Sequence, residues 1–158
     1  MNRMSAIVVL ALAMFAVAAC TPGADAPEQA MEVSEPWARA VPAGAPVAAG
    51  YLAIRNRSGF DDRLVEARSG SAQRVEIHEM RHEQGVMRMR LMENGLPLPR
   101  GQTVALEPGG YHLMFIAPVD DFERQQVRVT LVFERASPVD VDLDVRPVGS
   151  SGHSGHRL

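Results

Sequence analysis

The sequence predicts an all-β fold for residues 33–148. Short segments in which apolar and polar residues alternate recur along this part of the chain, and clusters of Gly, Pro, Asn and Asp separate them. Few stretches show the 3.6-residue period of a helix. The alternation is clearest near the end of the domain, where Asp140, Asp142 and Asp144 would face water and the aliphatic residues between them would face inward.

Nine segments have this alternating character. In chain order the expected strands are residues 33–40, 50–56, 63–67, 74–79, 86–92, 103–107, 112–117, 127–134 and 139–146. Turn-forming sequences such as Glu93-Asn94-Gly95 separate them. The eighth segment places Val127, Val129, Leu131 and Phe133 on one face. Nine short strands in about 115 residues predict a Greek-key sandwich or barrel of the immunoglobulin-like or cupredoxin-like type.

The composition is that of one globular domain. The chain has 158 residues, of which 46% are hydrophobic and 22% charged, and a domain of this size is stable as a monomer without disulfides. The formal net charge is −3, so we expect no nucleic-acid partner. Cys20 is the one cysteine of the sequence, which excludes an intramolecular disulfide, a multi-cysteine zinc site and a CxxC redox pair.

The N-terminus has the pattern of a secretion signal. Arg3 is followed by an uncharged apolar stretch at 6–19, which is too short to span a bilayer of about 30 Å but suits a signal peptide. The segment Val17-Ala18-Ala19-Cys20 resembles the lipobox of bacterial lipoproteins, in which the cysteine becomes the lipidated N-terminus. We therefore expect cleavage before Cys20, a lipid anchor on that residue and a periplasmic location in the cell envelope. The alternative is ordinary cleavage after Ala18, which would leave a free thiol.

These features divide the chain into four parts. Residues 1–19 are the expected signal peptide, and residues 20–32 comprise the lipidated Cys20 and a Pro- and Ala-rich flexible tether. Residues 33–148 form the β domain. Residues 149–158 are a disordered Gly, Ser and His tail.

Methionine and histidine gather in one part of the β domain. Five of the nine methionines lie in residues 80–114: Met80, Met87, Met89, Met92 and Met114. Three of the five histidines lie in or beside the same window: His78, His82 and His112. Neutral thioether and imidazole groups are ligands that suit the soft cation Cu(I).

The spacing of these residues is typical of neighbouring donors on strands. His112 and Met114 are two residues apart, as are Met87 and Met89, so each pair would share a face at about 6.6 Å separation. His78 ends a third expected strand, and three strand ends at one rim would bring the donors together. The alternative is that the methionines only fill the core and that a histidine beside a turn, above all His82, is solvated.

Three segments resemble the PCuAC family of periplasmic copper chaperones. They are residues 36–56 (PWARAVPAGAPVAAGYLAIRN), 78–89 (HEMRHEQGVMRM) and 108–114 (PGGYHLM). The pattern of that family is His, ten residues, Met, twenty-one residues and His-x-Met. Here His78 and Met89 have ten residues between them, whereas Met89 and His112 have twenty-two. We place the extra residue in the loop at 93–101, where an insertion need not disturb the strands.

The resemblance implies that His78, Met89, His112 and Met114 are the ligands of Cu(I). It also implies a cupredoxin-like fold and delivery of copper to the dinuclear site of cytochrome c oxidase. The copper-accepting partner would be an oxidase subunit or a thiol-containing assembly factor, and the protein would not be an enzyme.

Four further side chains remain open as metal ligands. They are Met80 and Met87 beside the expected site, and His153 and His156 in the tail. The tail histidines either bind Cu(II) or Zn(II) weakly or are simply solvated.

Three other functions compete with copper delivery. Blue-copper electron transfer needs a cysteine ligand, and Cys20 lies outside the folded domain. A catalytic metal site needs three His or His with carboxylates, and the acidic residues of the window are interpreted as solvated positions on strands and turns: Glu76, Glu79, Glu83 and Glu93. The remaining alternative is a metal-free immunoglobulin-like binding module of the envelope.

Overall fold

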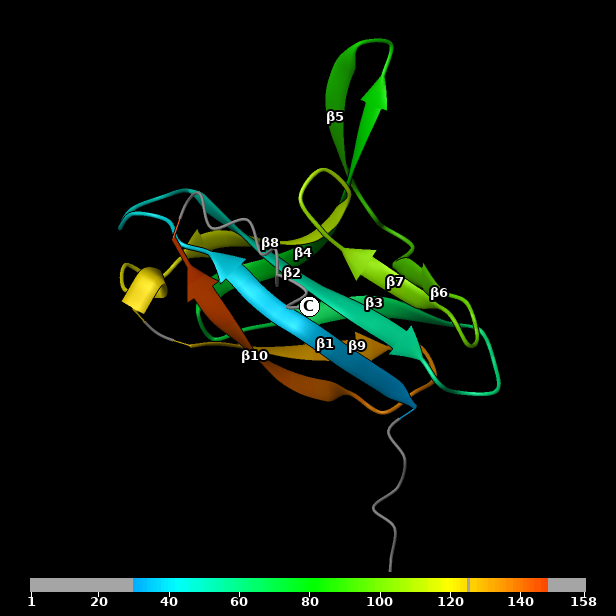
Figure 1. Cartoon of the computed structure of the whole chain (residues 1–158). Helices are drawn as coiled ribbons and strands as arrows, with labels where there is room; N and C mark the ends of the chain where they lie inside the picture. The colour runs from blue at the N-terminus through cyan, green and yellow to red at the C-terminus, as the bar shows by residue number, and fades with distance from the viewer. Residues whose placement is uncertain (1–29, 125, 148–158) are drawn as a thin grey trace, which may run out of the picture.

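The alternating segments form ten strands in the computed structural model, which describes residues 30–124 and 126–147 (Figure 1). The strands are β1 (Met31–Arg39), β2 (Val47–Asn56), β3 (Asp62–Arg68), β4 (Ala72–Glu83), β5 (Val86–Leu91), β6 (Leu96–Leu98), β7 (Thr103–Leu106), β8 (Tyr111–Pro118), β9 (Val127–Phe133) and β10 (Val139–Arg146). The all-β prediction is confirmed. The expected signal peptide, Cys20 and the tail with His153 and His156 lie outside the described residues.

Helical structure is limited in the described part of the chain to the 3₁₀ turn η1 (Phe122–Arg124). No helix of residues 30–124 or 126–147 has the length and apolar character needed to cross a bilayer.

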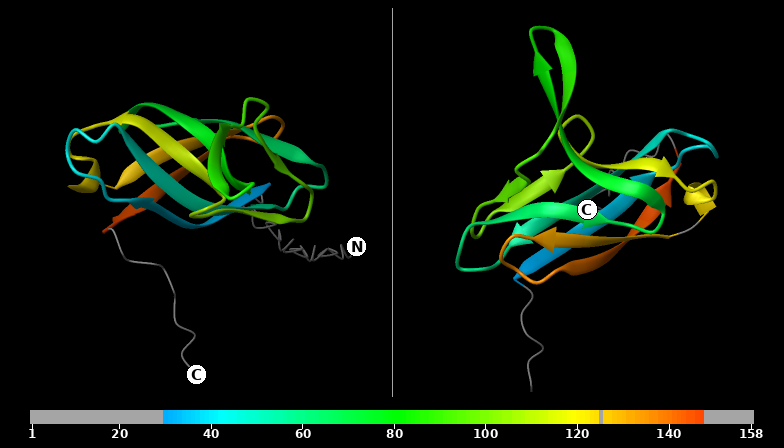
Figure 2. Two further views of the ribbon diagram at one scale, coloured as in Figure 1. Left: turned by 90° about the horizontal axis from the view of Figure 1, so that it is seen from above. Right: turned by 180° about the vertical axis from the view of Figure 1, so that it is seen from behind.

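The strands form one sheet that closes on itself. Their order is β5-β4-β8-β7-β2-β1-β10-β9-β3-β6, and β3 also pairs with β4 at Ala67 and Val75. Most neighbours are antiparallel, but β1 runs parallel to β10 and β7 parallel to β8. The closed sheet is a barrel (Figure 2). Closure leaves few free strand edges.

One face of the sheet supplies the core. Val127, Val129, Leu131 and Phe133 are all buried, as their alternation predicts. Other fully buried side chains come from strands far apart in sequence: Met31, Ile54, Leu64, Leu113, Phe115 and Leu143. Each large apolar side chain contributes about 1.5–3 kcal/mol when it is fully buried, so this face stabilises the barrel.

Two elements differ most from the expected strands, and β1 and β2 begin two and three residues earlier than expected. The three-residue strand β6, Leu96–Leu98, was not predicted, because its sequence Leu-Pro-Leu is too short for a period to show. Strand β4 extends to Glu83 rather than ending at residue 79. It turns through Gln84 and Gly85, whose φ angles of 51° and 83° are typical of a two-residue type I′ hairpin.

Among the strands of the described ranges β5 pairs with β4 alone, so the outer part of this hairpin projects from the barrel (Figures 1 and 2). We call residues 79–90 the β4–β5 hairpin. Its outer part has water on both faces, in contrast to the strands that enclose the core.

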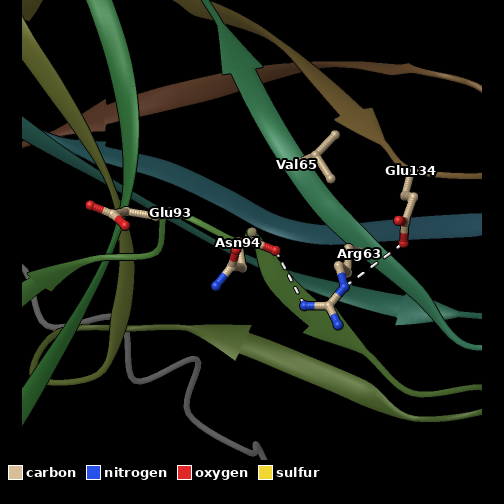
Figure 3. A pocket seen from close by; sticks show the side chains of 6 residues that line it. Arg63, Val65, Glu93, Asn94 and Glu134 are labelled. Carbon is tan, nitrogen blue, oxygen red and sulfur yellow. Dashed lines mark hydrogen bonds and ion pairs between the residues drawn. The ribbon is translucent and has the colours of Figure 1, made fainter.

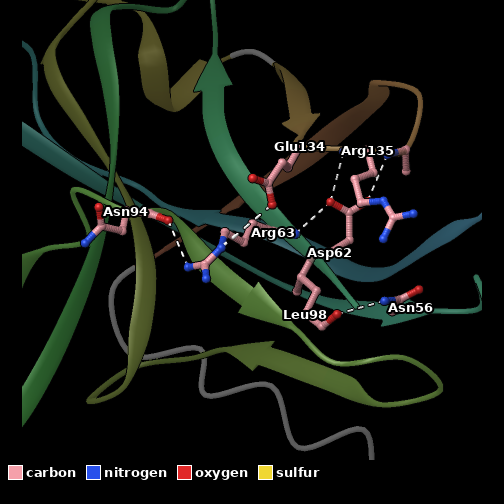
Figure 4. Close-up of polar contacts among 8 residues, drawn as sticks. Asn56, Asp62, Arg63, Asn94, Leu98, Glu134 and Arg135 are labelled. Atoms are coloured by element: carbon pink, nitrogen blue, oxygen red, sulfur yellow. Dashed lines mark hydrogen bonds and ion pairs between the residues drawn. The ribbon is translucent and has the colours of Figure 1, made fainter. Parts of the chain in front are cut away.

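Two buried polar side chains join the loops at one end of the barrel (Figure 4). The amide of Asn56 donates to the carbonyl oxygens of Phe60 at 2.9 Å and Leu98 at 2.7 Å. The carboxylate of Asp62 accepts three backbone N–H groups, from Arg63, Arg135 and Ala136, at 2.7–3.0 Å. Buried polar groups need such partners, and these bonds therefore fix the loops before β3 and after β9.

We expect Asn56→Ala to lower the free energy of unfolding by about 1–3 kcal/mol, because it leaves two carbonyl oxygens without their donor. Urea denaturation measures the change. Asn94→Ala is the control, since Asn94 is exposed and its replacement should cost less than about 0.5 kcal/mol. Equal effects of the two substitutions would contradict the role assigned to Asn56.

Candidate metal centre

The four predicted ligands lie on one face of three adjacent strands, β5, β4 and β8. The pairings that define this face are His78 with His112, Glu76 with Met114, and Met80 with Met89. Directly opposed residues on neighbouring strands point to the same side of a sheet. Leu113 and Phe115, which alternate with the ligands of β8, are buried in the core. The four side chains therefore lie on the outer face of the barrel.

The expected convergence of three strand ends at a rim was wrong in detail. His78 lies in the middle of β4, because that strand continues for five residues beyond it. The donors share one sheet face, where the pairing of His78 with His112 joins two residues that are 34 positions apart in sequence.

The rings of His78 and His112 are direct neighbours. Their centroids are 5.8 Å apart and their planes are inclined by 38°. A metal–imidazole bond is about 2 Å long, so this separation is compatible with two rings that share one ion.

The two nitrogens of His78 have different surroundings. Nε2 lies 2.9 Å from Oε2 of Glu76. An ionised carboxylate can only accept a hydrogen bond, so in neutral His78 the proton is on Nε2. Nδ1 is buried and is the one such side-chain nitrogen or oxygen, within the described ranges, that has no hydrogen-bond partner. Nδ1 therefore holds an unused lone pair.

Glu76 is held in place from its other side. Arg74 Nε donates to Oε1 of Glu76 at 2.7 Å. This bond and, second, the bond from His78 lower the pKa of Glu76 below its usual value. A metal-bound imidazole commonly donates its other N–H to a carboxylate, which orients the ring, and Glu76 is placed to do this.

This role of Glu76 differs from the solvated strand position that the sequence predicts. The spacing Glu76-Ile77-His78 was an available signal, because residues two apart share a strand face. Two other acidic residues of the window are surface ion-pair partners: Glu79 contacts Arg81 at 2.8 Å and Glu83 contacts Arg90 at 2.9 Å.

His112 is oriented by the turn that precedes β8. Nδ1 lies 3.2 Å from the carbonyl oxygen of Gly110, and a carbonyl only accepts, so the proton of the neutral ring is on Nδ1. Nε2 then has the free lone pair. The same oxygen accepts the backbone N–H of Met80 at 3.0 Å, so the turn is tied to β4. Gly109 has a φ of 88°, a backbone conformation that residues other than glycine rarely adopt.

Burial keeps the ring of His112 neutral. The side chain is 5% exposed, and burial lowers the pKa of His112 below 6.5, against a smaller opposite effect of the Gly110 bond. Neighbouring His78 lowers this pKa further. An imidazole must be neutral to bind a metal, and the lowered pKa keeps His112 neutral to a lower pH than an unperturbed imidazole.

The two thioethers differ in accessibility. Met114 follows His112 by two residues on β8 and is half-buried. Met89 lies on the β4–β5 hairpin and is 44% exposed. One sulfur is therefore held against the barrel, whereas the other is open to a second molecule.

No other location in the described ranges brings two imidazoles and two thioethers to one face. Residues 30–124 and 126–147 contain no group of three or more His, Cys, Asp and Glu side chains that could hold a metal. A polar hollow of about 440 Å³ lies elsewhere (Figure 3). It is lined by Arg63, Val65, Glu93, Asn94, Gly95 and Glu134. It has neither imidazole nor sulfur, so it lacks the donors that define the candidate centre.

Similarity to known proteins covers the whole described barrel. A family model described as "Putative lipoprotein LpqE-like" matches residues 31–145. The protein "Putative lipoprotein Lxx21020" of Leifsonia xyli subsp. xyli is 31% identical over 127 residues, which are 80% of this chain and 74% of that protein.

Solved structures share the fold. The copper-bound PCuAC domain from PmoF2 has a TM-score of 0.60 and 25% identity, over 75% of this chain and 93% of that one. The solution structure of CuI-DR1885 from Deinococcus radiodurans has a TM-score of 0.55 and 25% identity, over 82% and 85% of the two chains. The predicted cupredoxin-like, immunoglobulin-like fold class is confirmed.

We expect His112 of the metal-free protein to titrate below pH 6.5, because its pKa is lowered by burial. NMR observation of its ring protons against pH gives the midpoint, and the urea-unfolded chain, with an imidazole pKa near about 6.5, is the control. As the pH falls, His112 takes up its proton at a higher pH in the unfolded chain than in the folded chain. The contribution of His112 to the free energy of unfolding is therefore complete above the pKa of the unfolded chain and is lost as the pH falls to the pKa of the folded chain. A folded midpoint at or above the unfolded one would contradict the burial of this ring.

Proposed function

We propose that this chain is a copper chaperone of the cell envelope. The premise is that the chain belongs to the LpqE-like family and has a PCuAC-type domain. In this proposal His78, Met89, His112 and Met114 bind one Cu(I), which is the cargo of the protein rather than a cofactor. The protein is not an enzyme and acts as a monomer.

The observation that carries the proposal is the unpartnered nitrogen of His78. A buried polar atom without a hydrogen bond costs about 1–3 kcal/mol, and such atoms call for a functional explanation. Nδ1 of His78 is such an atom, and the His78 ring is a direct neighbour of the His112 ring, whose Nε2 also has a free lone pair. Both rings thus have a nitrogen available to a metal.

The donor set favours a soft, singly charged ion. Two imidazoles and two thioethers are neutral, and thioethers select Cu(I) over harder cations. The bound ion keeps its positive charge, so affinity depends on the softness of the donors and on their placement. Arg74 and Glu76 support this placement from outside the donor set.

Release of the ion follows from the unequal exposure of the ligands. Met89 is accessible on the β4–β5 hairpin, whereas His112 is buried. A thiolate of an acceptor can therefore replace the Met89 sulfur first and the buried ligands later. Copper remains Cu(I) throughout this ligand exchange, and no electron is transferred.

The proposed function includes a copper acceptor and a location at a membrane. We propose delivery to the dinuclear copper site of cytochrome c oxidase, directly to a subunit or through a thiol-containing assembly factor. Cys20 would hold the protein to a membrane by its lipid. A relative named as a lipoprotein and a family described in the same way support this anchor.

A metal-free binding module is the competing function. In that case the methionines of the window would serve as packing residues. Met87 and Met89 are 50% and 44% exposed, and exposed side chains contribute little to a core. The exposure therefore favours the metal-binding function.

We expect Met89→Leu and Met114→Leu each to weaken Cu(I) binding at least about tenfold, equivalent to about 1.4 kcal/mol, because each removes one sulfur ligand. Anaerobic titration against a chromophoric Cu(I) chelator measures the affinity. A Met-to-Leu change conserves volume and costs less than about 1.5 kcal/mol of stability, so both variants should fold.

Met92→Leu is the matched control for these variants. Met92 follows β5 directly and packs against the core, so its replacement should leave Cu(I) affinity unchanged. Wild-type affinity in all three variants would exclude the proposed ligands and favour the metal-free module.

A further inference from the structure

The outer part of the β4–β5 hairpin has a second set of soft donors. Beyond the pair formed by Met80 and Met89, the next pair on the same face is His82 with Met87. His82 is two residues from Met80 on β4, so the two also share this face. Met80, His82 and Met87 are three neutral donors that the proposed centre does not use.

The positions of His82 and Met87 are not explained by packing. Met87 is 50% exposed and His82 is exposed as well. The residues of β5 are all exposed, and β5 contacts no strand other than β4 through its backbone. An exposed ribbon gains little stability from apolar side chains, because they stay in water.

Charge is confined to the opposite face of the hairpin. The charged side chains there form ion pairs with one another, Arg81 with Glu79 at 2.8 Å and Arg90 with Glu83 at 2.9 Å. Arg88 also lies 3.6 Å from Glu83. The face with the methionines therefore has no charged group between residues 79 and 90 when His82 is neutral.

We propose that Met80, His82 and Met87 form a second Cu(I) site on the outer part of the hairpin. The inference rests on the proposed function, since it assigns this domain a second ion of the same kind. Directly opposed strand residues have Cβ atoms about 4.5–5.5 Å apart, and diagonal neighbours are within reach of long side chains. Methionine has three rotatable bonds and a polarisable sulfur, which allows both thioethers to turn toward the imidazole of His82.

The second site is weaker and more accessible than the first. It has three donors rather than four, and none of them is fully buried. Met80 lies opposite Met89, so the two sites adjoin along the hairpin. An ion can pass between them when a bond to one sulfur forms as a bond to the other breaks. Copper stays Cu(I), and no proton or electron moves.

Anaerobic Cu(I) titration of residues 20–158 tests the inference. Cys20→Ser, His153→Asn and His156→Asn are included, so that the other soft donors outside the barrel do not bind copper. We expect two Cu(I) per chain, the second bound more weakly. The methyl NMR signals of Met89 and Met114 should shift with the first equivalent, and those of Met80 and Met87 with the second.

The double variant His82→Asn, Met87→Leu should bind one Cu(I), with the affinity of the first equivalent changed less than about threefold, which is below 1 kcal/mol. Both residues are exposed, so the fold should be retained. Met92→Leu is the control and should still bind two ions. Two ions in the double variant, or one ion in the parent protein, would overturn the second site.

The Met114→Leu variant separates this outcome from failure of the proposed function. If Met114→Leu loses or weakens binding of the first Cu(I) equivalent while the parent binds only one ion, the chaperone function is supported and the second site is rejected. If Met114→Leu leaves the first equivalent unchanged, the proposed centre itself is wrong, and with it the inference that rests on it.

Discussion

The pairing of His78 with His112 across β4 and β8 is the constraint on which the candidate centre depends. Each ring uses one nitrogen to contact a pure acceptor, Glu76 in one case and the Gly110 carbonyl in the other. The ring orientations are therefore set by the protein before any ion arrives. Such preorganisation reduces the ordering cost of binding.

The barrel separates stability from function by the alternation of its strands. In β8, Leu113 and Phe115 face the core while His112 and Met114 face outward. Packing can hold the strand rigid without occupying the ligand face. The β4–β5 hairpin, which has no core on either side of its outer part, adds accessible sulfur at the edge of this rigid platform.

Much of the fold could be predicted from the sequence, because alternation is a local property. It located β9 and β10 within one residue of their ends, but the end of β4 was missed since the segment HEMRHE has no apolar alternation. The pairing of β4 with β8 depends on contacts distant in sequence, so the spacing predicted that His78 and His112 come together but placed them at a rim instead of on the sheet face. The spacing of Glu76 and His78 indicates a shared strand face, whereas the role of Gly110 follows only from the side-chain geometry.

The proposed function requires that Nδ1 of His78 and Nε2 of His112 bind the same ion. Long-range ¹H–¹⁵N NMR tests it most directly, because imidazole nitrogen shifts report both the position of the proton and the presence of a metal. The account predicts protons on Nε2 of His78 and Nδ1 of His112 at neutral pH, and large shifts of the two other nitrogens together on addition of one Cu(I). The opposite protonation of either ring, or a shift at only one of the two, would contradict it.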